Sequence, residues 1–124
     1  MVNNPVNWFE IPVSDIDRAK AFYDQVFEID IQIVDLDGTM MGFFPGDVSK
    51  SGATGSLMQH ESYTPSHHGT LVYLACEDLK HELSRVESAG GKILREKTMI
   101  SPQHGFMGVM EDTEGNRVAL HSNQ

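Results

Sequence analysis

The sequence predicts an α+β fold built from two βαβββ modules, which we expect to form a curled, eight-stranded mixed sheet around a cleft. The main observation is a weak internal repeat: residues 8–16 resemble residues 71–79, so that Asp15 corresponds to Asp78, 63 residues later. Each segment is a strand-like run that ends at an acidic residue and enters an amphipathic helix. A four-stranded sheet with one helix cannot bury both faces, so we expect the modules to pair, within one chain or between chains.

The first half of the chain predicts one helix and four strands. The helix is expected over 14–28, with Ser14 or Asp15 as its N-cap, because either side chain can accept hydrogen bonds from free backbone amides. Asp37-Gly38 is a strong signal for a two-residue hairpin turn. A flexible stretch over 47–55 precedes the last strand of this half. The predicted strands are 8–13, 29–33, 39–44 and 56–60.

The second half predicts the same order of elements. Its helix is expected over 78–89, and Gly90-Gly91 should end it, because glycine adopts the left-handed conformation at little cost. Residues 112–116 read as the turn before the last strand. The predicted strands are 71–76, 92–97, 105–111 and 117–121.

Length and composition favour a single domain over residues 1–124, with one module at about 5–62 and the other at about 68–122. The net charge of −9 argues against a nucleic-acid partner and would favour a cationic ligand if the acidic residues cluster. No apolar run approaches the roughly 20 residues of a membrane helix, and no secretory signal is visible, so a cytoplasmic protein without a membrane partner is expected. Cys76 is expected to be a small core residue rather than a nucleophile.

Strand alternation assigns one set of side chains to the cleft. Phe9, Ile11 and Val13 form the apolar set that should pack under the first helix, so their neighbours on the strand face the cleft. The same parity applies to the matching strand and to the last strand of the second half, and the repeat offset gives the first-half counterparts. Two tiers result, Trp8 with Ser56, Leu71 and Ala119, and Glu10 with Met58, Tyr73 and His121.

Two motifs resemble a known family. Residues 13–23, VSDIDRAKAFY, resemble the strand, acidic cap and R-A/S-x-x-F-Y signature that opens vicinal oxygen chelate (VOC) proteins. Residues 112–117, DTEGNR, resemble the D-P-x-G-N turn before the last strand of those proteins. With the repeat, the chain resembles the glyoxalase/bleomycin resistance/dioxygenase (VOC) superfamily, in a glyoxalase-related subgroup that lacks the usual metal ligands. The resemblance implies the glyoxalase/bleomycin resistance-like fold.

The metal-ligand positions of that family correspond here to Trp8, Ser56, Leu71 and Ala119. None of them is His, Glu or Gln, so we expect no metal ion and no other cofactor at these positions. Without a divalent ion the enediolate chemistry of the family lacks its Lewis acid. All eight cleft residues are therefore predicted to line a ligand site.

Individual cleft residues leave alternatives open. Trp8 can be a flat platform for an aromatic or cationic ligand, or plain packing at the vacated metal position. Glu10 can be a counter-charge or a base, or it can make a structural hydrogen bond, because an acid in an apolar strand needs water or a partner. His121 can pair with Glu10 or act as a base, or it can lie exposed near the end of the chain. Tyr73 is expected to line the site rather than to catalyse.

Two functions follow from these residues. The first is a metal-free protein of the bleomycin-resistance type that binds a cationic or aromatic small molecule. The alternative is a VOC-type enzyme, a lyase or isomerase related to lactoylglutathione lyase, with Glu10 and His121 as acid and base or in a rearranged metal site. A non-catalytic partner subunit has no positive support. We expect a homodimer, in which the two modules pair either within one chain or between the two chains of the dimer.

Overall fold

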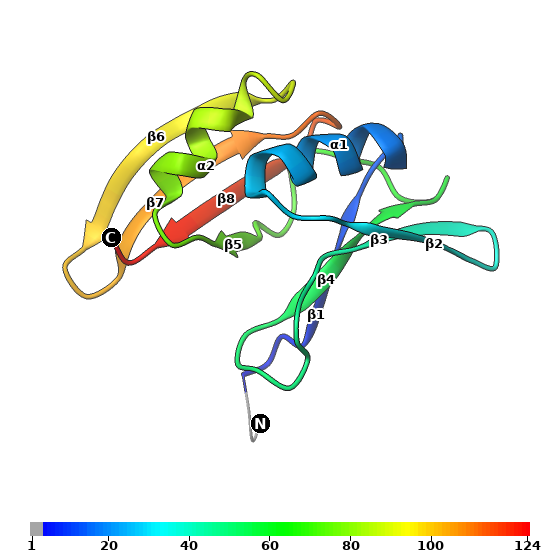
Figure 1. Ribbon diagram of the computed structural model, residues 1–124, viewed down its shortest axis with the longest axis horizontal. Helices are drawn as coiled ribbons and strands as arrows, with labels where there is room; N and C mark the ends of the chain where they lie inside the picture. The colour runs from blue at the N-terminus through cyan, green and yellow to red at the C-terminus, as the bar shows by residue number, and fades with distance from the viewer. Residues whose placement is uncertain (1–3) are drawn as a thin grey trace.

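The computed structural model describes residues 4–124, and over these residues the chain runs through βαβββ twice (Figure 1). This confirms the predicted α+β class. The first half contains β1 (Trp8–Pro12), α1 (Ile16–Phe27), β2 (Gln32–Leu36), β3 (Thr39–Phe43) and β4 (Thr54–Gln59). The second half contains β5 (Tyr73–Ala75), α2 (Leu79–Val86), β6 (Lys92–Ser101), β7 (Gly105–Glu111) and β8 (Arg117–Ser122).

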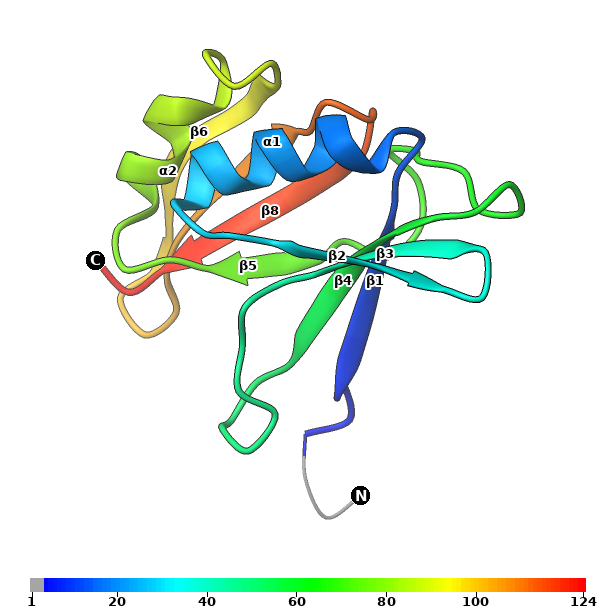
Figure 2. The ribbon, with the colours of Figure 1, turned by 45° about the vertical axis from the view of Figure 1, so that its right-hand side comes forward.

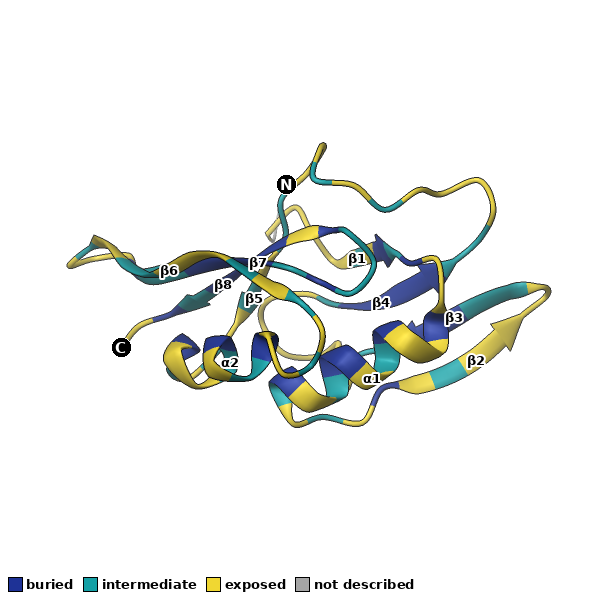
Figure 3. Ribbon diagram, turned by 90° about the horizontal axis from the view of Figure 1, so that it is seen from above, coloured by how far each residue is buried: buried dark blue, intermediate teal, exposed yellow. Residues whose placement is uncertain are grey.

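Each half forms a four-stranded mixed sheet of its own. The strand orders are β1-β4-β3-β2 and β5-β8-β7-β6, with the first pair of each sheet parallel and the others antiparallel. The eight predicted strands are thus divided between two sheets of identical topology. Figure 3 shows α1 and α2 next to each other on the same side of both sheets, and the two helices are in contact. We call the sheet faces turned away from the helices the open faces.

Both helices begin after an aspartate that caps them. The Asp15 carboxylate accepts a hydrogen bond from the Arg18 amide at 3.1 Å, and Asp78 accepts one from the Lys80 amide at 3.1 Å. Of the two predicted caps, Asp15 is therefore the one used. The helices start one or two residues later than predicted, because a capping residue itself lies outside the helix.

The end of the second helix differs from the prediction. Helix α2 stops at Val86 instead of continuing to residue 89. The Gly91 amide donates to the Val86 carbonyl at 3.0 Å, and Gly90 takes the left-handed conformation with φ of 104°. The two glycines end this segment as expected, but the last helical residue lies three positions before the predicted one, and residues 87–90 form a turn.

The strands follow the predicted pattern with shifted ends. Asp37 and Gly38 both have positive φ, 54° and 92°, which confirms the two-residue hairpin turn between β2 and β3. The predicted strand 92–97 is longer, because β6 reaches Ser101 through several irregularities in its pairing with β7. Strand β5 is shorter than predicted and starts at Tyr73, so Leu71 lies outside it.

The two halves share one hydrophobic core between the helices and the sheets. Phe22, Tyr23 and Val26 of α1 are fully buried there, and Leu79, Leu83 and Val86 line the core side of α2. The strands add Ile11 and Leu57 from the first sheet, and Met110, Val118 and Leu120 from the second.

No helix among residues 4–124 is both long enough and apolar enough to cross a membrane.

The turn over 112–116 joins the second half to the first. Asp112 is 2% exposed, and its carboxylate accepts a hydrogen bond from the Tyr23 hydroxyl at 2.7 Å. Burial and the Asp112 charge raise the pKa of Tyr23 well above 10, so the phenol stays a donor. Asn116 donates from its side chain to the Pro12 carbonyl at 2.7 Å. The motif recognised in the sequence therefore acts as a structural clamp.

Glu114 of the same turn covers the start of α1. Its carboxylate accepts from the Ser14 and Asp15 amides at 2.9 Å each and forms an ion pair with Arg18 at 2.7 Å. Burial alone would raise the pKa of Glu114, but hydrogen bonds from Arg18, Asp15, Thr113 and Ser14 outweigh it and lower the pKa below 4.5. A negative charge from the second half thus caps the helix of the first.

Candidate functional site

The first open face carries the side chains that strand parity assigned to it. Phe9 and Ile11 of β1 pack into the core, so Trp8 and Glu10 project from the opposite face. A side chain at Gly55 of β4 would meet the Phe9 ring, which places Gly55 on the helix side. The neighbouring β4 residues that share the open face are therefore Ser56 and Met58.

Strand register groups these residues differently from the two predicted tiers. In the parallel β1–β4 pair, Glu10 lies opposite Ser56, and Pro12 lies opposite Met58. Trp8 lies opposite Thr54, one step further toward the start of the strand. Glu10 is thus the neighbour of Ser56, whereas the offset between the two repeats predicts that Ser56 groups with Trp8. Parity fixes the face of a residue, but it does not fix its position along the neighbouring strand.

The second open face has the same register. Tyr73 lies opposite Ala119, and Ala75 lies opposite His121. Tyr73 is 51% exposed and Ala119 is fully buried. His121 is half-buried, and its Nε2 atom lies 2.6 Å from the His104 carbonyl oxygen, to which it donates. In the neutral ring this leaves Nδ1 as the acceptor nitrogen.

Two aromatic rings on the first open face cover β4. Trp8 of β1 and Phe43 of β3 lie on the two strands that flank β4, and their ring centroids are 5.9 Å apart in an edge-to-face contact. Phe43 lies opposite Ser56 in the β3–β4 pair. The rings therefore meet above β4, and Ser56 beneath them has an exposed fraction of 0%. Trp8 itself remains 37% exposed, so one side of the pair faces solvent.

Ser56 and Glu10 both carry polar groups that have no partner within the described range 4–124. The Ser56 hydroxyl is buried and has no hydrogen-bond partner among residues 4–124. Leaving a buried hydroxyl unpaired costs about 1–3 kcal/mol. Glu10 is exposed, and in the same part of the chain its side chain takes part in no hydrogen bond and no ion pair. The structural hydrogen bond considered for Glu10 thus has no partner among these residues.

The donor chemistry of the family's metal positions does not fit a metal ion in this chain. An indole, a hydroxyl and two aliphatic side chains occupy them, at Trp8, Ser56, Leu71 and Ala119. Divalent transition metals are held by imidazole, carboxylate or thiolate groups. In the described range 4–124, no three His, Cys, Asp or Glu side chains form a group that could hold a metal ion.

Cys76 follows β5 directly and packs against the core on the helix side, as the alternation predicts. Burial raises the pKa of its thiol to about 12, with a further contribution from the charge of Glu82. A thiol with this pKa stays protonated at neutral pH and is a poor nucleophile.

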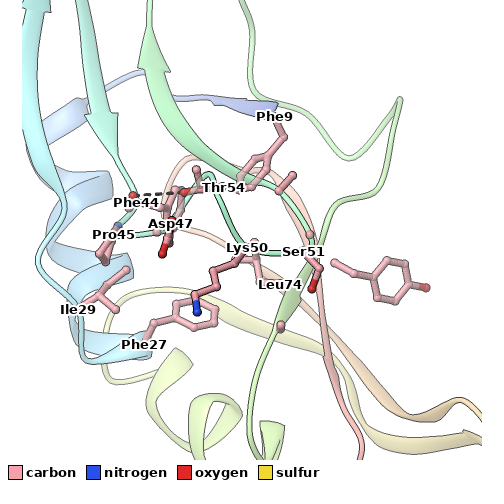
Figure 4. A pocket seen from close by; sticks show the side chains of 15 residues that line it. Phe9, Phe27, Ile29, Phe44, Pro45, Asp47, Lys50, Ser51, Thr54 and Leu74 are labelled. Carbon is pink, nitrogen blue, oxygen red and sulfur yellow. Dashed lines mark hydrogen bonds between the residues drawn. The ribbon is translucent and has the colours of Figure 1, made fainter. Parts of the chain in front are cut away.

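A cavity of about 480 Å³ lies at the junction of the two halves (Figure 4), and residues of both halves line it. Of the eight residues predicted to bind a ligand, Tyr73 is the one that lines it. In Figure 2 the loop between β3 and β4 hangs below β5, and both border the cavity. One signal for this cavity is present in the sequence, the flexible stretch 47–55, but no pattern links that stretch to the distant strand β5.

Comparisons with known proteins agree with this fold. The profile of the Glyoxalase/Bleomycin resistance protein/Dioxygenase superfamily matches residues 6–120. A glyoxylase-like domain-containing protein from Didymella fabae is 29% identical over 126 aligned positions, which cover 97% of this chain and 94% of the relative.

Solved structures give the same fold. Glyoxalase I from Zea mays, as its V278E mutant, superposes with a TM-score of 0.72 at 20% identity. The match covers 96% of this chain and 46% of the maize protein, so this chain spans about half of that enzyme's length. A glyoxalase-related enzyme from Fulvimarina pelagi superposes with a TM-score of 0.72 at 14% identity, and the match covers 97% of this chain and 88% of that protein.

Proposed function

This chain belongs to the Glyoxalase/Bleomycin resistance protein/Dioxygenase superfamily, and from that premise we propose that it binds a small molecule on its first open face without a metal ion. The observation that carries the proposal is the unpaired Ser56 hydroxyl beneath the Trp8–Phe43 ring pair, beside the unpaired carboxylate of Glu10. Small-molecule sites are typically lined in this way, by apolar and aromatic side chains with a few polar groups among them.

The chemistry of this face favours a flat cation as the ligand. The ring faces of Trp8 and Phe43 attract positive charge, and Glu10 supplies a full negative charge next to them. The net charge of −9 also favours a cationic ligand, because it attracts cations from solution. A ligand that displaces the edge-to-face contact of the two rings would also reach the Ser56 hydroxyl and give it a hydrogen-bond partner.

Replacing Glu10 by glutamine is expected to weaken binding of 10-methylacridinium, a flat fluorescent cation, by at least about tenfold. The change removes the counter-charge and keeps the size of the side chain. Binding of the uncharged 10-methylacridone should stay the same, and so should the melting temperature, because Glu10 is exposed and unpaired. Fluorescence titrations with both dyes and thermal melts of the variant measure these three quantities.

Glu87→Gln is the matched control, because Glu87 is exposed at the end of α2 on the helix side and the change in net charge is the same. An equal loss in both variants would show a long-range charge effect and not a site. Unchanged affinity of the Glu10 variant for the cation would remove Glu10 from the site.

An acid–base enzyme with Glu10 and His121 is the second candidate. In its favour, the hydrogen bond to His104 orients the His121 ring and leaves Nδ1 free to accept a proton. Two observations count against it. Glu10 and His121 lie in different sheets. In its own sheet His121 corresponds to Met58, which lies opposite Pro12, and not to Ser56, which lies opposite Glu10. The binding function therefore has the stronger support.

We also propose that the protein is a homodimer in which a second copy covers the outer strands. Val34 and Leu36 of β2 are 39% and 50% exposed, and Val34 shares the open face with Met41. On the matching outer strand β6, Leu94, Met99 and Ile100 are exposed as well. Apolar side chains gathered on an outer strand are a typical feature of a protein–protein interface.

The double variant Val34→Lys with Leu36→Lys is expected to raise the dimer dissociation constant by at least about tenfold, because each charge would have to be buried in the interface. Sedimentation equilibrium measures this constant. Val48→Lys, in the loop before β4, is the control for adding a charge at an exposed apolar position. A wild-type chain that sediments as a monomer at every concentration would contradict the dimer.

A further inference from the structure

The cavity at the junction of the two halves is bordered by four segments far apart in the sequence. Phe9 comes from β1, and Phe27 and Ile29 come from the end of α1 and the residues just after it. Leu74 comes from β5, and Phe44 opens the loop that leads to β4. Figure 4 shows these side chains around the cavity, with the loop on one side and the helix end on the other. A volume of about 480 Å³ falls in the range of sites for small organic molecules.

The apolar side of the cavity is held in place by packed rings. Phe9 and Phe44 have their centroids 5.7 Å apart, and Phe44 also makes an edge-to-face contact with Tyr23 at 5.5 Å. Tyr23 is fully buried and stacks on Phe27 at 6.1 Å. Since these rings belong to the core or pack against it, the apolar wall is formed before any ligand arrives.

Lys50 brings a positive charge to this wall. Figure 4 shows its side chain extending from the loop toward Phe27. Lys50 is exposed, and among residues 4–124 its side chain takes part in no ion pair or hydrogen bond. The other charged lining residue, Asp47, already has partners, because one carboxylate oxygen accepts from the Ser49 amide at 2.9 Å and from its hydroxyl at 2.5 Å.

The geometry points to a second binding site: we propose that the junction cavity binds a small organic anion with an aromatic or aliphatic body. The acid group would pair with Lys50, and the body would lie against Phe9, Phe27, Phe44 and Leu74. The apolar wall of this site lies on the other side of β1 from the cation site, because Phe9 packs toward the core and Glu10 points the opposite way. The two sites also differ in charge, one offering a carboxylate and the other an ammonium group.

The test uses a pair of probes that share an aromatic body. 8-Anilinonaphthalene-1-sulfonate carries a negative charge, and N-phenyl-1-naphthylamine is its uncharged counterpart. The wild-type protein is expected to bind the sulfonate saturably, with one site per chain. Lys50→Met should weaken the sulfonate at least about tenfold and leave the uncharged probe unchanged, because the methionine keeps the apolar stem and removes the charge.

Two further variants decide where the probe binds. Lys80→Met on α2 makes the same change in net charge at an exposed position outside the cavity and should leave both probes unaffected. Ala53→Trp fills the cavity from its loop and should weaken both probes. Near-ultraviolet circular dichroism confirms that each variant is folded.

Three results would overturn the proposal. One is wild-type affinity for the sulfonate in Lys50→Met, and another is an equal loss in Lys50→Met and Lys80→Met. The third is the absence of saturable binding by the wild-type protein. The Glu10→Gln variant keeps its affinity for the sulfonate if the two sites are separate, so failure of this proposal and failure of the cation site are distinguishable.

Discussion

Asp112→Ala is expected to lower the free energy of unfolding by about 3 kcal/mol or more. The buried Asp112 carboxylate accepts from the Tyr23 hydroxyl, from the Asn116 side chain at 3.0 Å, and from the Glu114 and Asn116 amides at 2.8 and 2.9 Å. Alanine leaves the Tyr23 hydroxyl buried without an acceptor and releases the turn that clamps the two halves. Chemical denaturation followed by tryptophan fluorescence gives the free energy.

Two companion variants give this result its meaning. Tyr23→Phe removes one donor and leaves the carboxylate with its other partners, so it should cost only about 1 kcal/mol. Asp17→Ala removes an exposed carboxylate in the first turn of α1 and should change stability by less than about 0.5 kcal/mol. If Asp112→Ala cost no more than Asp17→Ala, the turn would not be the clamp that the hydrogen bonds indicate.

Gly55→Ala is expected to cost about 3 kcal/mol and to abolish binding of 10-methylacridinium on the first open face. An alanine Cβ at Gly55 would overlap the backbone carbonyl oxygen of Phe9 and would lie 2.7 Å from the Phe9 ring. A backbone atom cannot rotate away as a side chain can, so β1 and β4 must separate. That separation moves Glu10 away from Ser56, which lies opposite it.

Gly108→Ala in β7 is the matched control, since it places the same methyl group on the helix side of the other sheet. Its Cβ would lie 3.0 Å from Leu83 Cδ1 and 3.2 Å from the Arg95 carbonyl oxygen, distances that small shifts can relieve. A cost of about 1 kcal/mol and unchanged dye binding are expected. Thermal melts and dye titrations of both variants make the comparison, and equal behaviour of the two would contradict the assignment of Glu10 and Ser56 to one site.

The set of residues that form the candidate site was only partly predictable from the sequence. Alternation placed Trp8 and Glu10 on the face opposite Phe9, because a strand has a period of two residues whatever surrounds it. The repeat offset placed Ser56 on the same face, but the tier that it suggested was displaced by two residues. Phe43 was not among the predicted residues, because its contact with Trp8 depends on β3 and β1 lying on the two sides of β4.

The sequence by itself determined the features that depend on neighbouring residues. The βαβββ order, the caps at Asp15 and Asp78 and the hairpin turn at Asp37-Gly38 arise from hydrogen bonds and backbone preferences within a few residues. The tertiary structure decided how those elements meet. The register that brings Glu10 beside Ser56, and the cavity that brings Lys50 near the helix end and β5, depend on loop lengths and on long-range packing. No local pattern encodes a contact of that kind, because its free energy is gained only when distant segments have already been brought together.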